Sequence, residues 1–303
     1  MSEILIRGAT ILTMEGYDKI INDGEIAIAG DRIISVGARG SAPEYFKDKR
    51  IIDGSGMVAM PGFINCHTHA AMTLMRGYAD DMPLMKWLNE KIWPLEEKLQ
   101  PEDFYWGTML CTLEMIKSGT TTFADMYFEM GQVARAVEKS GMRACLSRGM
   151  IGVAPNAQQA IDESIRFVEE WHGKADGRIK AMFGPHAPYT CPPEYLQKVA
   201  GLAEKYGVGI HIHVAETLDE AENIKAAYGT TPVRHLEALG IFDLPVLAAH
   251  CVHLDQVDME ILAAKKVSIA HCPESNMKMA AGISPVPALI RHGALVALGT
   301  DGA

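Results

Sequence analysis

The sequence is poor in the features that mark nucleic-acid-binding proteins. Its 28 Lys and Arg residues are outnumbered by 38 Asp and Glu residues, which gives a net charge of -10 and a pI near 5.6. Binding to a phosphate backbone depends on clustered basic side chains, and the sequence contains no such cluster. A nucleic-acid partner is therefore disfavoured, and a small-molecule ligand is favoured.

Long apolar runs and paired cysteines are also missing. No apolar stretch approaches the ~20 residues that a membrane-spanning helix needs. The opening residues MSEILIRGATIL lack the basic start, apolar core and cleavage site of a signal peptide. The six cysteines are scattered singly without a C-x-x-C pair, as is typical of reduced thiols. We therefore expect a cytoplasmic protein without membrane association, and the sequence leaves open whether it forms a homo-oligomer.

The sequence does contain enough apolar residues for a large core, arranged in two regions. Hydrophobic residues make up 48% of the 303 positions. Residues 1–60 hold short β-rich segments separated by Gly, Asp and Asn turns, with no good helix between them. We expect this region to form a small β-domain. From residue 61 onward, strand-like and helix-like segments alternate.

Eight strand-like segments predict the fold of the second region. The first is GFINCHTH, the last is LVALGTDGA, and helical patterns separate them. Several helical patterns end in glycine, as is typical of helix C-caps. Eight such alternations predict an α/β fold, a (β/α)8 TIM-type barrel over residues 61–303. An open doubly wound sheet is the alternative, but the glycine-rich loop that would follow its first strand is absent.

Metal-binding residue types recur at the ends of the predicted strands. In GFINCHTH, His67 and His69 are two residues apart and share one face of the strand. His213 ends the fifth strand, and Asp301 follows the eighth. Because the carboxyl ends of barrel strands meet at one face, we expect these four residues to bind one metal ion. Three imidazoles and a carboxylate suit Zn²⁺ with one position open for water, and Fe²⁺ is the alternative.

Further titratable residues lie near the same strand ends. Glu216 follows His213 by three residues, where it would give a proton to a ring nitrogen or a leaving group. His250 ends the sixth strand and would polarise the bond under attack or bind the nucleophile. Asp301 would also accept a proton from water whose pKa a metal lowers to about 7. These residues predict metal-assisted hydrolysis, whereas His211 is interpreted as a packed strand histidine.

Several motifs together resemble one enzyme family. The segments VAMPGFINCHTH, HIHVAET, AAHCVH and LGTDGA resemble the amidohydrolase superfamily. GTTTFADMY, FGPHAPYTC and HCPESNMKM make the sequence most similar to its 5-methylthioadenosine/S-adenosylhomocysteine deaminase family. The resemblance implies a zinc-dependent barrel with a small accessory β-sandwich built from both chain ends. Members continue past the final aspartate, so we expect residues 1–60 to be the N-terminal part of this sandwich and its C-terminal part to be missing from this chain.

The resemblance also implies a reaction and a set of substrate contacts. The enzyme would convert adenosine-type nucleosides, such as 5′-methylthioadenosine and S-adenosylhomocysteine, to the inosine-type product and ammonia. Glu96 would bind two ribose hydroxyls, with Glu97 as its alternative. Arg148 would bind the amino-acid carboxylate of S-adenosylhomocysteine, unless it pairs with a structural carboxylate. The implied substrate contacts are Glu96, Arg148, His186, Glu216 and Asp301.

One difference between this sequence and the two-metal members of the superfamily bears on the number of metal ions. Two-metal members use a carboxylated lysine from the fourth strand, but here that strand ends in His186. The resemblance therefore favours one metal ion per subunit. The alternatives that remain are other mononuclear amidohydrolases (5′-deoxyadenosine deaminase, guanine deaminase or a chlorotriazine hydrolase) and an inactive metal-binding barrel.

Overall fold

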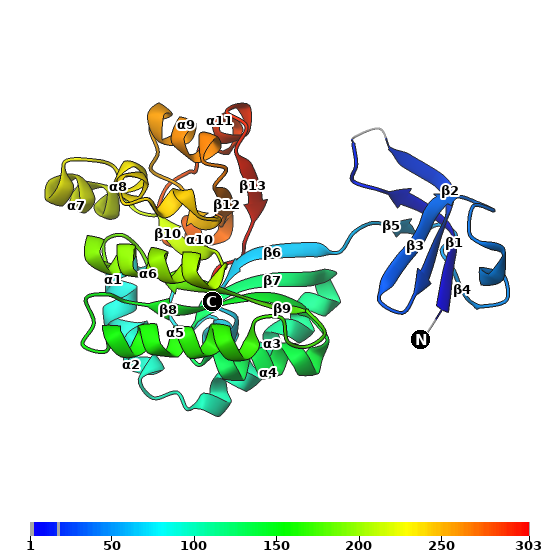
Figure 1. Ribbon diagram of the computed structural model, residues 1–303, viewed down its shortest axis with the longest axis horizontal. Helices are drawn as coiled ribbons and strands as arrows, with labels where there is room; N and C mark the ends of the chain where they lie inside the picture. Colours follow the sequence, from blue (N-terminus) through cyan, green and yellow to red (C-terminus); the bar gives the residue numbers. More distant parts are fainter. Residues whose placement is uncertain (1–2, 17–18, 303) are drawn as a thin grey trace. The chain divides into compact units, whose positions relative to one another are not determined.

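The computed structural model describes residues 3–16 and 19–302, and the chain divides into two compact units, Met1–Gly62 and Phe63–Ala303 (Figure 1). The first unit is a five-stranded sheet over a small core of Leu5, Ala27 and Phe46. Phe46 comes from a short 3-10 helix, η1 (Glu44–Phe46). The strands fall in the β-rich segments expected from the sequence, and they are β1 (Glu3–Leu12), β2 (Ile20–Ala29), β3 (Arg32–Ala38), β4 (Arg50–Asp53) and β5 (Val58–Ala59).

The second unit is built on eight parallel strands. Each strand pairs with the next one along the chain, in the order β6 to β13. This consecutive order confirms the predicted (β/α)8 barrel, whereas a doubly wound sheet reverses its strand order. The strands are β6 (Phe63–Thr68), β7 (Thr120–Tyr127), β8 (Arg143–Met150), β9 (Ile179–Pro185), β10 (Ile210–Val214), β11 (Val246–His250), β12 (Ser268–His271) and β13 (Leu295–Leu298).

Helices connect and cover these strands (Figure 1). Apolar strand residues such as Phe123, Leu146, Phe183 and Ile210 are fully buried in the core between strands and helices. The helices α3, α4, α6 and α7 are each followed by a glycine with positive φ, as the C-cap pattern predicts. The connecting helices are α3 (Pro101–Ser118), α4 (Met130–Ser140), α5 (Ala157–Trp171), α6 (Pro193–Tyr206), α7 (Leu218–Tyr228), α8 (Pro232–Ala238), α9 (Gln256–Ala264), α10 (Pro273–Lys278) and α11 (Val286–Arg291).

An additional helical segment lies between β6 and α3, in a region for which the sequence analysis predicted no helix. It consists of α1 (Leu84–Trp87), the π-helical turn η3 (Leu88–Ile92) and α2 (Trp93–Glu96). Pro94 lies inside this segment and has no backbone N–H to donate, which disfavours a regular α-helix here. π-helical turns occur often at functional sites, and this one contributes Leu88 and Ile92 to the wall of the central cavity.

The first and last strands of the sheet meet at a seam. Thr68 in β6 forms an isolated parallel bridge with Asp301. Asn65 Nδ2 donates a hydrogen bond of 2.8 Å to Thr300 Oγ1, and Thr300 N donates one of 3.1 Å to Asn65 Oδ1. These contacts hold the residues that follow β13 beside β6. They therefore bring the predicted ligand Asp301 next to the predicted ligands of the first strand.

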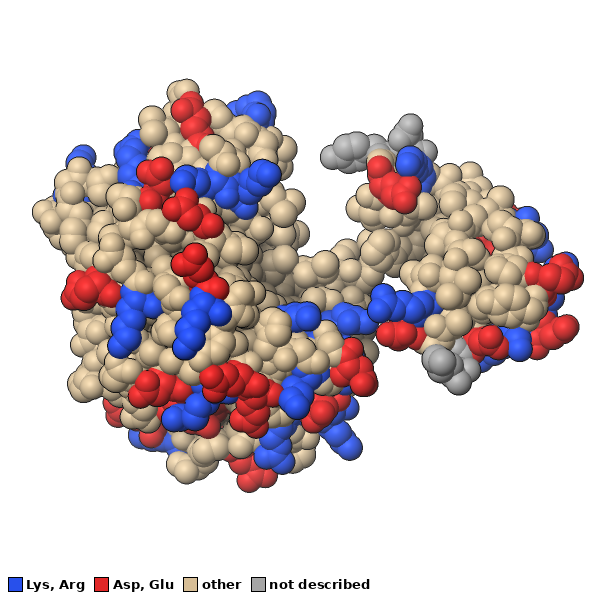
Figure 2. All heavy atoms as spheres, in the orientation of Figure 1, with Lys and Arg blue, Asp and Glu red and all other residues tan. Residues whose placement is uncertain are grey.

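Two surface properties bear on the expected partner. Basic and acidic side chains are interspersed on the face of the second unit drawn in Figure 2, as a small-molecule ligand would allow. Over residues 3–16 and 19–302, no helix is both long and apolar enough to cross a membrane.

Candidate active site

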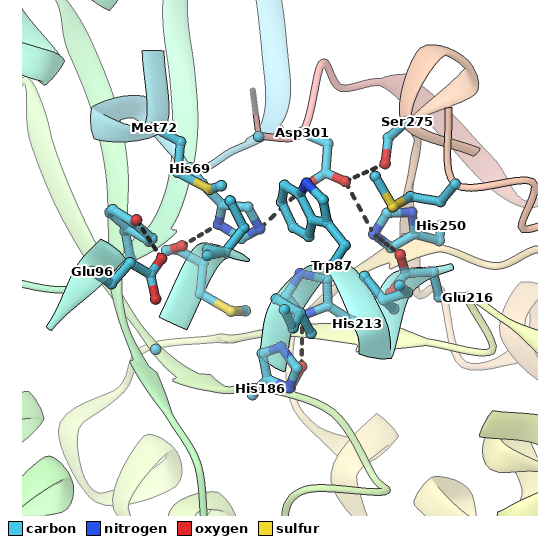
Figure 3. A pocket seen from close by; sticks show the side chains of 18 of the residues that line it. His69, Met72, Trp87, Glu96, His186, His213, Glu216, His250, Ser275 and Asp301 are labelled. Carbon is cyan, nitrogen blue, oxygen red and sulfur yellow. Dashed lines mark hydrogen bonds and ion pairs between the residues drawn. The ribbon is translucent and has the colours of Figure 1, made fainter. Parts of the chain in front are cut away.

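A cavity of about 310 Å³ opens at the carboxyl ends of the barrel strands. Its size is in the range of small-molecule sites, and Figure 3 shows the side chains around it. The helical segment before α3 supplies an apolar wall that includes Trp87, Leu88 and Trp93. The strand ends supply polar side chains, among them His69, His213, Glu216, His250 and Asp301. The cavity therefore combines an apolar wall with a convergent polar floor.

The four predicted metal ligands lie together at this floor. His67, His69, His213 and Asp301 each offer a ligand atom, and these atoms lie within 4.8 Å of one another. The Nε2 atoms of His67 and His69 are both 3.1 Å from Asp301 Oδ1. Gly299 permits this approach, because a Cβ at that position would lie 2.8 Å from His67 Cβ. The structure therefore brings the four residues that the strand-end pattern singled out into one cluster.

Backbone carbonyls hold two of these imidazoles in a fixed orientation. His69 Nδ1 lies 2.5 Å from Met126 O, and His213 Nδ1 lies 2.7 Å from His186 O. Each Nδ1–H donates to a carbonyl, which directs Nε2 at the cluster. This arrangement is common around metal-binding histidines, since it fixes the tautomer and raises the basicity of the ligand nitrogen.

His211 orients the third imidazole and is more than a packing residue. The sequence interpretation placed it in the core, and it is fully buried. However, its Nε2 is 2.8 Å from His67 Nδ1, and its Nδ1 is 3.3 Å from Ser147 Oγ. His211 therefore fixes the ring of His67 through a hydrogen bond, as the carbonyls do for the other two histidines.

The electrostatics of the cluster fit a divalent metal. His67 Nε2 is buried and has no hydrogen-bond partner among the residues that the structure describes, because its 3.1 Å contact with Asp301 lacks hydrogen-bond geometry. Burial lowers the pKa of His67 to about 4 and holds that of His213 well below its usual range. Burial alone would raise the pKa of Asp301, but the imidazoles of His67 and His69 keep it well below its usual range. Neutral imidazoles beside a carboxylate are the protonation states that bind metal.

His69 differs from the other two histidines in its charge. Burial would lower its pKa, but the nearby carboxylate of Asp301, 3.1 Å from Nε2, raises it to about 9. The metal-free cluster therefore holds a proton on His69 at neutral pH. Metal binding has to displace this proton, so the affinity for metal increases with pH.

Glu216 and His250 form a second group beside the ligands. His250 Nε2 lies 3.8 Å from Glu216 Oε1 and 3.8 Å from Asp301 Oδ2, so the imidazole stands between two carboxylates (Figure 3). Its other nitrogen is 3.1 Å from Asn276 Oδ1. Burial raises the pKa of Glu216, whereas the pKa of Asp301 is lowered. Neighbouring carboxyl groups with opposite shifts are typical of an acid and a base in one site.

Ser275 is a site residue that the sequence analysis missed. Its hydroxyl donates a hydrogen bond of 2.5 Å to Asp301 Oδ2. This contact holds Oδ2, whereas Oδ1 is the oxygen that lies 3.1 Å from the Nε2 atoms of His67 and His69. Figure 3 shows Ser275 beside Asp301. Ser275 lies in the segment HCPESNMKM, but the sequence of that segment does not indicate that α10 packs against the end of β13.

Glu96 and His186 both line the cavity, as the resemblance implied. Glu97, the alternative to Glu96, is not among the lining residues. Tyr127, which sequence reasoning missed, donates a hydrogen bond of 2.5 Å from its hydroxyl to Glu96 Oε1. His186 Nδ1 is 2.9 Å from Thr190 Oγ1. The structure therefore presents a fixed carboxylate at the outer part of the cavity.

Arg148 lies apart from the central cavity. Its guanidinium pairs with Glu163 at 2.8 Å, stacks 5.6 Å from the centre of the Phe128 ring, and lines a neighbouring cavity. This is the pairing with a structural carboxylate that the sequence left open. A substrate carboxylate would have to replace Glu163 to reach Arg148.

Two comparisons with known proteins, one with family models and one with curated relatives, agree on the family. The model of the amidohydrolase family matches residues 58–303. A 5-methylthioadenosine/S-adenosylhomocysteine deaminase from Pelotomaculum thermopropionicum is 75% identical over 303 residues, which are 100% of this chain and 70% of that protein.

Solved structures are similar over almost the whole chain. A zinc-bound adenosine deaminase from Xanthomonas campestris superposes with a TM-score of 0.92 and 32% identity, covering 99% of this chain and 69% of that one. A zinc complex of atrazine chlorohydrolase from Arthrobacter aurescens TC1 gives a TM-score of 0.89 and 27% identity, covering 99% and 72%. Both neighbours are zinc-bound.

Proposed function

Because the chain belongs to the amidohydrolase family, we propose that it is a zinc-dependent deaminase of adenosine-type nucleosides. Its substrates are 5′-methylthioadenosine and S-adenosylhomocysteine, the compounds named for its 75% identical relative. The observation that carries the proposal is the convergence of His67, His69, His213 and Asp301 beside the Glu216–His250 pair. Zinc is the proposed metal, with one ion per subunit, since the donor set is borderline-soft and a similar deaminase structure holds zinc.

The overall reaction adds water to C6 of the purine and releases ammonia. The new C6–O bond forms and the C6–N bond breaks. Of the two protons of water, one leaves with the exocyclic NH₂ group as ammonia and one remains on N1 of the inosine-type product. When bound, the metal supplies Lewis acidity that lowers the pKa of water at this site. The remaining steps are proton transfers and hydrogen bonds from side chains of this chain.

The proposed roles of two carboxyl groups are based on the opposite directions of their pKa shifts. Asp301, whose pKa is lowered, accepts the proton that water gives up. Glu216, whose pKa is raised by burial, donates a proton to N1 as charge develops on the ring. His250 lies between them and hydrogen-bonds the oxygen that adds to C6. Glu96 binds the ribose hydroxyls at the outer part of the cavity, and His186 contacts the nucleoside from the wall.

Ammonia release tests the proposal directly. The zinc-loaded chain is incubated with S-adenosylhomocysteine, 5′-methylthioadenosine and adenosine, beside a chelator-treated sample and a sample to which zinc is returned. We expect release that chelation abolishes and zinc restores. His213→Ala should lose metal and activity together, whereas His292→Ala, which changes an exposed histidine, should keep both.

A negative result would also be informative. Folded, metal-loaded protein that releases no ammonia from these nucleosides would contradict the proposal. The same protein would then be tested with guanine and a chlorotriazine, since the fold is shared with an atrazine chlorohydrolase. Activity that chelation does not change would reject the metal-dependent mechanism.

A further inference from the structure

The loops that follow β10 and β11 are held in an unfavourable backbone conformation. Ala215, His250 and Cys251 have φ values of 50°, 73° and 50°. Non-glycine residues rarely adopt this left-handed region, and they persist there only when their surroundings hold them. Two of these residues flank the groups proposed to act on the substrate, because Ala215 precedes Glu216 and Cys251 follows His250.

A buried carboxylate holds the first of these loops. Glu220, in the first turn of α7, accepts hydrogen bonds from Ala215 N at 2.9 Å and from Glu216 N at 2.8 Å, one to each carboxylate oxygen. Glu220 is only 2% exposed. Its own backbone N–H donates to Thr217 Oγ1 at 3.2 Å, which caps the helix. The carboxylate therefore binds two successive N–H groups of the strained turn.

The carbonyl of the same turn binds the neighbouring loop. Ala215 O accepts hydrogen bonds from Val252 N and His253 N, both at 3.0 Å. The residue before Glu216 and the loop after His250 are therefore fixed to one another through the backbone of Ala215. This arrangement leaves the Glu216 carboxylate facing His250 Nε2 at 3.8 Å (Figure 3).

We propose that Glu220 is a positioning residue that holds Glu216 in its place opposite His250. The proposal rests on the role of Glu216 in the proposed function. Glu220 itself does not line the cavity, so it acts through the backbone of Ala215 and Glu216. A purely structural carboxylate at a helix N-terminus would stabilise α7 without affecting the chemical step.

The test compares Glu220→Gln with a matched change elsewhere. Glutamine keeps one acceptor oxygen and places an NH₂ group against the second backbone N–H, so one clamp bond is lost. Asp258→Asn is the control, since Asp258 is also buried and bonds a backbone N–H, that of Asp255, at 3.1 Å near a helix N-terminus. It lies outside the cavity.

We expect Glu220→Gln to lower kcat about 100-fold, the scale of a misplaced catalytic group, with KM and zinc content nearly unchanged. Asp258→Asn should leave kcat near that of the wild type even if both variants lose stability. Because Glu220 acts through Glu216, the double variant Glu216→Gln/Glu220→Gln should be no slower than Glu216→Gln alone. Additive losses, or an unchanged kcat in Glu220→Gln, would overturn the proposal.

Two further measurements keep the test decisive. If Glu220→Gln does not fold, Glu220→Asp keeps both acceptor oxygens at a shorter reach and should show the same selective loss of kcat. If the wild-type chain releases no ammonia, the proposed function fails, and crystal structures of the variants decide the positioning role. Movement of Glu216 away from His250 supports that role, and an unaltered loop rejects it.

Discussion

Removing one hydroxyl, in Tyr127→Phe, tests how the cavity recognises a nucleoside. The hydroxyl donates a 2.5 Å hydrogen bond to Glu96 Oε1, while the ring also packs near Phe104 and His69. Phenylalanine keeps these ring contacts, so the change isolates the hydrogen bond. Glu96 would then be free to rotate away from the position proposed for the ribose.

The size of the effect follows from the charge on Glu96. A hydrogen bond to a charged group contributes about 1.5–3 kcal/mol, which corresponds to about a 10- to 100-fold loss of kcat/KM. Burial raises the pKa of Glu96, and the hydrogen bond from Tyr127 lowers it. Loss of that bond raises the pKa further, and only the carboxylate form accepts two hydroxyls. The defect should therefore grow as pH falls through this pKa and shrink as pH rises.

The assay compares two nucleosides across the mildly acidic and neutral range. Adenosine carries both ribose hydroxyls, and 2′,3′-dideoxyadenosine carries neither. We expect Tyr127→Phe to reduce kcat/KM for adenosine and to leave the dideoxy compound nearly unaffected. Tyr206→Phe is the control, because its hydroxyl bonds the surface residue Glu169 at 2.7 Å. An equal loss for both nucleosides, or no loss, would refute the assignment of Glu96 to the ribose.

Three further predictions concern catalysis, specificity and pH. Glu216→Gln should lower turnover about 10²- to 10⁴-fold while metal content stays normal, and unchanged turnover would reject Glu216 as the proton donor. Arg148→Met should leave KM for both S-adenosylhomocysteine and 5′-methylthioadenosine near the wild-type values, because Glu163 holds Arg148 outside the cavity; a selective increase of KM for S-adenosylhomocysteine would show that the substrate carboxylate replaces Glu163. Burial raises the pKa of Asp125 from 3.8 to about 6, so between these values the folded state binds more protons than the unfolded one. The contribution of Asp125 to the free energy of unfolding of chelated protein should then fall by about 3 kcal/mol as pH rises through this range. Asp125→Asn removes this contribution and keeps the opposite one from buried histidines such as His67, so in denaturant titrations the stability of the variant should rise relative to the wild type by that amount over this range, and parallel pH dependences would contradict the assignment.

The metal cluster was predictable because it depends on regular structure. Alternation along a strand puts His67 and His69 on one face, and a barrel gathers the ends of its strands. Given eight strand-like segments, the positions of His213 and Asp301 then follow. The side chains that orient these ligands were harder to predict. The position of His211 in its strand is equally consistent with a residue that only packs in the core. Its 2.8 Å contact with His67 is what shows its orienting role.

Other contacts depend on geometry that sequence patterns do not contain. The segment before α3 was not predicted to be helical, but it forms a helical wall with a π-helical turn despite Pro94. The bond from Tyr127 to Glu96 depends on the angle at which that wall packs on the barrel. The pairing of Arg148 with Glu163 likewise depends on which way a long side chain turns at the end of β8. These details follow from tertiary packing and not from local propensity.

The seam between β6 and the residues after β13 has a consequence for the order of folding. Asn65 and Thr300 are 235 residues apart in the chain, and their hydrogen bonds lie beside the cluster that needs both His67 and Asp301. Contacts of such long sequence separation are slow to form, because closing the intervening loop costs entropy. A ribosome-bound chain that has exposed only its first strands holds two of the four ligands. Folding intermediates made during synthesis therefore have no hydrolytic centre, and metal capture coincides with closure of the barrel.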